Sequence, residues 1–520
     1  MIFIAFYVLE RNGDYVKKTV FIKNAAVLTA SSLILRFIGI IFKVWLASSI
    51  GSEGIGLYQV IFSVYTLFAA FSTCGVCTAV TRLVANQLVT GSKSGIKKII
   101  KSANLINTAV ASVSFAVLFF GAEILSSKAL NDVRAVLSLK ALSFSLVFMG
   151  ISSNIRGYFI ARRKTAPFAA VSLAEQIVRI AVVLFAVSRV KGLGISYSCA
   201  AVFLGDAAAE MLCALTMNIL YKKDFKRLKL TQNGAETGIN REIIRISSPI
   251  TGGRYLNSLL RTVENIMMPR LLAVASASAL SLFGMIKGMA LPILFFPGVL
   301  LNSFSTLLIP EISEASVLGK KLLLKSGTEK ITVLTAAVGF IFSAVFFVAG
   351  EQIGQLVYKD EGVGTLLCLL SPIVPLMYLD SVCDGILKGL DLQSFTFKTS
   401  IADSVLRLVL IYFIVPKWGL YGFIGIMYFS NALTCLLNVG MLTKKTGAEI
   451  NTFKSFILPL ILAYVSVLLS NLVLRNIEAF GRLVYIILLV GFSVLLYSLS
   501  LLFFGCIENK PIVKKFPEKS

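Results

Sequence analysis

The sequence has no histidine among its 520 residues, and this absence narrows the chemistry open to the chain. Histidine proton relays, Ser-His-Asp triads and histidine metal sites are excluded. The G-x-x-x-x-G-K-[ST] motif of nucleotide-binding loops is also missing, which argues against ATP hydrolysis by this chain. The eight cysteines are dispersed, and the only C-x-x-C pair, Cys74 and Cys77, lies in an apolar run where membrane packing explains it better than redox or metal chemistry. We therefore expect a protein that is not an enzyme and that binds no metal or other cofactor.

Charged residues are scarce as well, at 15% of the chain against about 25% in an ordinary soluble domain. Hydrophobic residues make up 57%, and the mean hydropathy is +0.85. The net charge of +24 could suggest nucleic acid, but nucleic-acid-binding proteins gather their bases on a soluble surface. Here the bases come in short clusters between apolar runs. The composition predicts an all-α, polytopic membrane protein whose partner is the lipid bilayer and not nucleic acid.

About fourteen apolar segments have the length of a membrane-spanning helix. Lysine and arginine concentrate in every second loop between them, which predicts a multi-pass protein of the cell membrane with both termini in the cytoplasm. The segments suggest this layout: a cytoplasmic N-terminal segment at 1–24, an N-lobe of helices 1–6 at 25–220, a basic cytoplasmic linker at 221–242, a C-lobe of helices 7–12 at 243–442, helices 13 and 14 at 443–505, and a basic cytoplasmic tail at 506–520.

Two apolar segments carry the same charged pair. Glu175 precedes Arg179 by one helical turn, and Asp403 precedes Arg407 in the same way 228 positions later. An acid and an arginine spaced in this way face each other on one helix and neutralise each other in a poor solvent. The repeat predicts two six-helix lobes related by a parallel internal duplication. We interpret both pairs as structural intramembrane pairs that brace their lobes.

Glycines extend the repeat. The same spacing places Gly157 on Gly385 and Gly194 on Gly422. This register supports the parallel duplication.

Other bases in the apolar segments have no such partner in sequence. Arg36 and Lys43 share one face of the first segment, and Arg254 and Arg261 share one face of the segment that opens the second half. Lys287 adds a base in the next segment. A charge in the membrane is costly and usually functional, so we expect these five to bind an anionic substrate. The alternative is that they pair internally with Glu264 or Asp206 and only fix helix packing.

Asp206 and Glu210 lie one turn apart with no base between them. Two like charges so close favour retention of a proton or a cation. They are our candidates for an ion-coupling site. The alternative is again internal pairing.

Two sequence blocks point to a family. Gly51-Ser-Glu-Gly-Ile-Gly-Leu-Tyr-Gln59 follows the first apolar segment, and Arg156-Gly-Tyr-Phe159 leads through Pro167 to Glu175-Gln176 and Arg179. These blocks resemble the stage V sporulation protein B group of the multidrug/oligosaccharidyl-lipid/polysaccharide exporter superfamily. The resemblance covers nearly the whole chain, including the fourteen-segment layout.

This resemblance implies a polysaccharide-type flippase whose two lobes open alternately around a cationic cavity, with peptidoglycan and the spore cortex among the processes served. We expect the chain to move a polyprenyl pyrophosphate-linked saccharide from the inner to the outer leaflet, as a monomer, with cell-wall synthesis enzymes as further partners. Three alternatives stay open: a cation-coupled multidrug or metabolite exporter of the same fold, a flippase for exopolysaccharide or teichoic-type precursors, and a membrane scaffold that transports nothing. A drug exporter favours an acidic or aromatic cavity, and a scaffold should tolerate loss of the arginines.

Overall fold

The computed structural model describes residues 15–73, 75–228, 230, 238–475 and 481–506, and the elements it contains there are helices. Cys74, most of the predicted N-terminal segment, part of the predicted linker and nearly all of the predicted tail lie outside these described residues. Within them, eleven helices are long and apolar enough to cross a membrane. The chain is therefore an all-α, multi-pass membrane protein.

Two of these helices contain a glycine turn. Helix α2 (Tyr15–Thr73) turns at Gly51, and α15 (Gln393–Thr446) turns at Gly419. Each includes two of the fourteen predicted segments. Helix α9 (Ile239–Leu272), which holds a further predicted segment, is too charged to count among the eleven. The predicted number of fourteen spans thus stays a prediction.

The chain forms two compact units. Unit 1 contains the described residues up to Gly39 together with Phe68–Tyr255, and unit 2 contains Ile40–Leu67 together with the described residues from Leu256 onward. The predicted lobe boundaries fall between helices, whereas the compact units divide α2 and α9 themselves.

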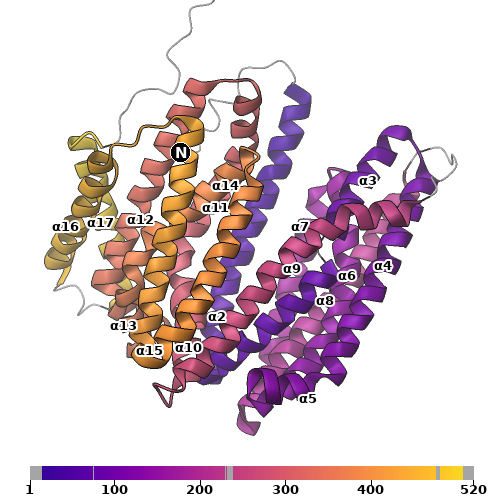
Figure 1. Cartoon of the computed structure of the whole chain (residues 1–520), viewed down its shortest axis with the longest axis horizontal. Helices are drawn as coiled ribbons and strands as arrows, with labels where there is room; N and C mark the ends of the chain where they lie inside the picture. The colour runs from indigo at the N-terminus through magenta and orange to yellow at the C-terminus, as the bar shows by residue number, and fades with distance from the viewer. Residues whose placement is uncertain (1–14, 74, 229, 231–237, 476–480, 507–520) are drawn as a thin grey trace, which may run out of the picture. The chain divides into compact units, whose positions relative to one another are not determined.

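Unit 1 is a bundle in which α6 (Val136–Ala161) packs against α8 (Ile195–Lys226), α4 (Lys93–Phe120) and α3 (Val76–Thr90), while α7 (Thr165–Val190) packs against α8 (Figure 1). Short elements complete it: α5 (Ala122–Ile124), η1 (Leu125–Leu130), η2 (Val133–Ala135) and η3 (Lys191–Leu193). Glycines set the close approaches. A Cβ on Gly157 would lie 2.7 Å from the carbonyl oxygen of Cys77, and one on Gly205 would lie 2.3 Å from the side chain of Val183.

One end of unit 1 is fixed by polar contacts over an apolar core that includes Ile99, Ile155 and Met217. The buried Tyr158 donates a hydrogen bond from its hydroxyl to Asp224 at 2.8 Å, and Arg162 Nε lies 3.1 Å from the same carboxylate. Lys164 also pairs with Asp224. These contacts join the ends of α6 and α8.

Unit 2 contains the middle of α2, the second part of α9 and the following elements: α10 (Ala279–Gly284), η4 (Met285–Ala290), α11 (Leu291–Val317), α12 (Lys321–Tyr358), α13 (Glu361–Leu370), η5 (Ser371–Ile373), α14 (Val374–Gly389), α15, η6 (Phe453–Ile457), α16 (Leu458–Leu474) and α17 (Arg482–Phe503). Helix α2 meets α10 closely, because a Cβ on Gly56 would lie 2.1 Å from the carbonyl oxygen of Leu280. The hydroxyls of Ser52 and Ser281 lie 2.5 Å apart at the same contact.

Gly194 and Gly422, which the repeat spacing pairs in sequence, differ in backbone conformation. Gly194 precedes α8 with φ 109°, a conformation that favours glycine, but the turn in α15 falls on Gly419 with φ 54°. Gly422 is a buried residue inside α15. The turn of α15 therefore lies three residues before the glycine that the repeat spacing pairs with Gly194.

Candidate functional site

In unit 1, one arginine lies between two carboxylates. Arg179 Nη2 is 2.7 Å from Glu175 Oε1 on the same helix, α7, and Arg179 Nε is 2.9 Å from Asp206 Oδ1 on α8. The three side chains are mostly buried, at 26%, 13% and 17% exposure. The close approach of Gly205 to Val183 brings α8 against α7 at this level. Asp206 is thus engaged by a base, Arg179, that the sequence pattern pairs only with Glu175.

Glu210 completes this cluster without such a partner. It lies one turn beyond Asp206 on α8 and is only 9% exposed. It forms no hydrogen bond or ion pair with any other described residue, although the charges of Glu175, Arg179, Arg156 and Asp206 act on it. Two carboxylates therefore contact the guanidinium of Arg179, and the third acid, Glu210, has no direct contact with it.

Arg156 is a functional candidate that the sequence pattern does not single out. The apolar run ends just before it, but α6 continues to Ala161 and carries Arg156 in a half-buried position. Its guanidinium lies over the Phe168 ring at 4.2 Å, and its Nε is buried without a hydrogen-bond partner among the described residues. Arg156 and Arg254 are both near enough to the Cys77 thiol to act on it electrostatically. The Arg-Gly-Tyr-Phe block, with buried Tyr158 and Phe159 after the arginine, is the signal that could have shown the helix continuing.

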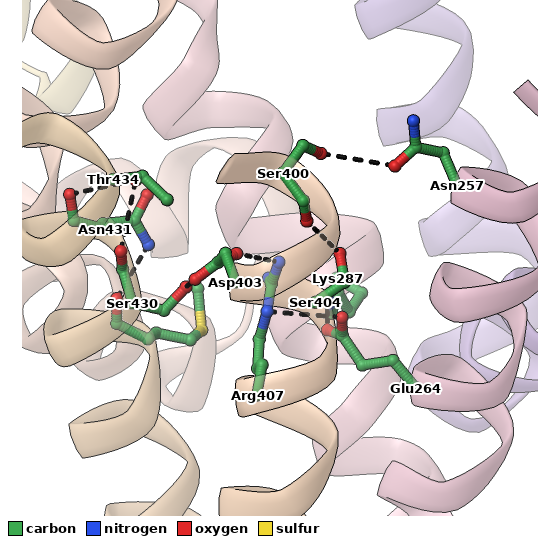
Figure 2. Close-up of polar contacts among 11 residues, drawn as sticks. Asn257, Glu264, Lys287, Ser400, Asp403, Ser404, Arg407, Ser430, Asn431 and Thr434 are labelled. Carbon is green, nitrogen blue, oxygen red and sulfur yellow. Dashed lines mark hydrogen bonds and ion pairs between the residues drawn. The ribbon is translucent and has the colours of Figure 1, made fainter. Parts of the chain in front are cut away.

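Unit 2 builds a longer and electrically balanced network (Figure 2). Lys287 Nζ is 2.9 Å from Glu264 Oε1, and Arg407 Nε is 3.5 Å from Glu264 Oε2. Arg407 Nη2 is in turn 2.8 Å from Asp403 Oδ2. The Ser430 hydroxyl donates a hydrogen bond to Asp403 Oδ1 at 2.6 Å. Two acids and two bases close this network with no net charge.

The five predicted substrate-binding bases fall into both units. Arg36 and Arg254 belong to unit 1, and Lys43, Arg261 and Lys287 belong to unit 2. Four of them are exposed, whereas Lys287 is 21% exposed and occupied by Glu264. Arg36, Lys43 and Arg261 form no ion pair with a described residue. The geometry thus separates Lys287 from the other four.

Unit 2 also carries an apolar groove of about 580 Å³ between α12, α14 and α16. Its lining includes Phe340, Pro375 and Tyr464, with Val465 and Leu468 on α16. A second hollow of about 580 Å³ shares Val465 and Leu468 and continues along α16 to Gln352, Asn471 and Arg475. The part of the groove between α12, α14 and α16 is lined almost wholly by apolar side chains.

Comparison with known proteins identifies what this arrangement resembles. Residues 21–316, more than half of the chain, match the family described as "Polysaccharide biosynthesis protein". Stage V sporulation protein B of Bacillus subtilis (strain 168) is 28% identical over 439 residues, which cover 82% of this chain and 84% of that protein. Lipid II flippase MurJ of the same organism is 22% identical over 422 residues, 75% of this chain and 76% of that protein.

Solved structures agree on the fold. The inward closed conformation of a lipid II flippase MurJ matches with a TM-score of 0.69 and 12% identity, covering 92% of this chain and 99% of that chain. An inward-facing multidrug resistance MATE family transporter matches with a TM-score of 0.63 and 12% identity, over 80% and 98% of the two chains. These relatives are named as a flippase and a transporter, which agrees with the prediction that the chain is not an enzyme.

Proposed function

The chain belongs to the polysaccharide biosynthesis protein family, and from that premise we propose that it is a flippase for a polyprenyl pyrophosphate-linked saccharide. The observation that carries the proposal is the set of exposed bases Arg36, Lys43, Arg254 and Arg261 within helices of a membrane protein. A charge in such a helix costs about 2.5–3.5 kcal/mol, so its retention calls for a function. The relationship to a protein named as a lipid II flippase supports the same substrate class.

The chemistry of the bases suits a pyrophosphate. The planar guanidinium donates two parallel hydrogen bonds to a phosphate, a geometry that lysine does not offer. In unit 1, Arg36 and Arg254 would bind head-group phosphate, and in unit 2 Arg261 would do so, with Lys43 as a further point charge. Lys287 would act through Glu264 and not by direct contact, because its ammonium is already paired.

The apolar groove along α16 supports the second half of the substrate. An isoprenoid tail is as apolar as the lipid chains around it, so it can lie along an apolar protein surface without losing apolar surroundings. Phe340, Pro375, Leu460 and Leu468 provide such a surface within the membrane part of unit 2. The tail would remain in this groove while the head group moves.

Translocation would proceed by alternating access, with the head group entering from the inner leaflet. Both termini would lie in the cytoplasm, as the loop charges predict. The specific substrate we propose is a peptidoglycan-type precursor, and the similarity to a stage V sporulation protein supports a role at the spore cortex. We further propose that the chain acts as a monomer beside cell-wall synthesis enzymes.

The test is to deplete the protein in its own cells and to identify which lipid-linked precursor accumulates on the inner leaflet. Complementation with Arg36→Ala or Arg261→Ala should fail although the variants reach the membrane in normal amount. Arg189→Ala is the matched control, because this exposed arginine stacks on Phe185 at 5.1 Å and lies near the end of α7. Accumulation of no lipid-linked saccharide, or full complementation by both variants, would overturn the proposal. A change in drug resistance alone would favour an exporter.

A further inference from the structure

We propose that Glu210 is a proton-binding site and that Arg156 couples it to the anionic substrate, so that proton binding and pyrophosphate binding favour each other. The coupling rests on the proposed function, whereas the proton site stands on the geometry of unit 1. Both residues lie in this unit, on α8 and α6, and these two helices pack directly against each other.

The charged groups around Glu210 do not balance. Four charged side chains act electrostatically on Glu210 from α7, α6 and α8 itself: Glu175, Arg179, Arg156 and Asp206. The neighbouring thiol is Cys213. Elements η2 and η3 pack near the N-terminal end of α8, where Ser196 bonds to the Arg134 carbonyl. Three carboxyl groups thus face two bases, and one negative charge is in excess.

Contact geometry decides which carboxyl group bears that excess. Glu175 and Asp206 each contact Arg179 directly, at 2.7 and 2.9 Å. Glu210 is 9% exposed and receives no hydrogen bond from a described residue. An ionised carboxylate buried without a donor is so costly that such a group takes up a proton instead. Glu210 therefore alternates between a neutral acid and a carboxylate that pulls on nearby bases.

The ligand is a proton and not a metal ion. A metal cation needs several oxygen ligands at once, usually six or more for the hard divalent ions. Over the described ranges, no group of three or more acidic, histidine or cysteine side chains is arranged to hold a metal ion. A proton needs a single oxygen: an O–H bond forms on Glu210 when it is taken from water, and the same bond breaks when it is released.

Arg156 provides the link to the substrate. It is close enough to Glu210 to act on it electrostatically, and with Arg254 it also acts on Cys77. Its Nε is buried without a hydrogen-bond acceptor among the described residues, so the guanidinium has unused capacity. An ionised Glu210 attracts this guanidinium, and protonation removes the attraction. Arg156 then becomes available, beside Arg254, for a phosphate oxygen.

The experiment has a direct readout on the full-length purified protein. Infrared spectra recorded over a pH series should show a protonated-carboxyl C=O band that disappears as the pH rises. Glu210→Gln should abolish this band. Asp206→Asn should keep the band but move its loss to lower pH, because one acid fewer then acts on Glu210. Glu314→Gln, at an exposed glutamate, is the control for a carboxyl group in water. Size-exclusion profiles check that each variant is folded.

The coupling is measured with inorganic pyrophosphate as the probe. As the pH is lowered, the affinity of the wild type for pyrophosphate should rise roughly 10-fold more than the affinity of Glu210→Gln does. This is within the usual range of coupling between two sites. Glu210→Gln should bind pyrophosphate tightly over the whole pH series, since glutamine mimics the protonated acid. Pyrophosphate itself titrates, but this contribution is the same for both proteins and cancels in the comparison. Arg156→Gln should keep the infrared band but lose the pH-dependent difference.

The outcomes separate this inference from the proposed function. A titrating band that survives in Glu210→Gln, an unchanged pH dependence in Arg156→Gln, or a response to Na⁺ at constant pH would overturn the inference while leaving the flippase intact. A band and coupling that behave as expected in a protein that moves no lipid-linked saccharide would uphold the proton site and overturn the function.

Discussion

Unit 1 and unit 2 each place an acid and an arginine one helical turn apart, but the surroundings of the two pairs differ in charge. Arg179 of unit 1 meets a second carboxylate, Asp206, whereas Arg407 of unit 2 meets Glu264, which is itself held by Lys287. The first cluster has an excess of acid and the second is balanced. The same local device thus serves as a brace where its charges are matched, and leaves a site for a proton where they are not.

The largest effect should come from breaking the balanced network at its centre. Glu264 is 5% exposed and serves two bases, so Glu264→Gln leaves Lys287 with an uncompensated charge and takes from Arg407 one of its two carboxylates. Removing one partner of a buried ion pair typically costs about 3–5 kcal/mol. The expected result is a clear fall in the free energy of unfolding, measured by denaturation in detergent micelles.

Its control removes the charge pair as a unit. The double variant Glu264→Leu with Lys287→Met keeps the network neutral, since Arg407 still has Asp403. Replacing a buried ion pair by apolar groups of similar size is often close to neutral. If the double variant is no more stable than Glu264→Gln, charge balance is not what holds unit 2 together.

A smaller effect should separate the two acid–arginine pairs. Asp403→Asn weakens a balanced pair and the hydrogen bond from Ser430, so we expect a loss of about 1–3 kcal/mol. Glu175→Gln removes one acid from a cluster that has too many, and Arg179 keeps Asp206. Its unfolding free energy should change by less than about 1 kcal/mol. Equal losses in the two variants, in parallel denaturation curves, would show that the units do not differ in this way.

The glycine turns should contribute a modest effect, below that of the Glu264 network. Gly194 and Gly419 have positive φ, and an alanine at either position meets no backbone atom within 3 Å. Strain alone should therefore cost about 1–2 kcal/mol for Gly194→Ala and for Gly419→Ala. Matching shifts in thermal unfolding would support equivalent turns in the two units, and a shift in one variant only would argue against them.

Sequence reasoning reached the helical class, the family and the two charged pairs, because each depends on composition or on contacts within one helix. The spacing of Asp403 and Arg407 fixes their contact whatever the rest of the fold does. The second acidic partner of each arginine could not be predicted, since Asp206 reaches Arg179 and Glu264 reaches Arg407 from another helix. The pairing of Lys287 with Glu264 is of the same kind, and the sequence could state it only as an alternative.

Two further points depended on local backbone detail. Arg156 lies just beyond an apolar run, but such a run marks only the core of a membrane helix, and α6 continues past Arg156 to Ala161. The turn of α15 falls on Gly419 and not near Gly422, because a single residue with positive φ sets a bend and a repeat register does not locate it.

The most direct test of the account is transfer of a fluorescent polyprenyl pyrophosphate-linked saccharide across proteoliposomes that contain the full chain, followed with a membrane-impermeant quencher. We expect a transfer rate well above that of protein-free vesicles. Transfer should be lost in Arg261→Ala and kept in the control Arg189→Ala. Transfer equal to that of empty vesicles, or an Arg261→Ala rate equal to that of the wild type, would contradict it.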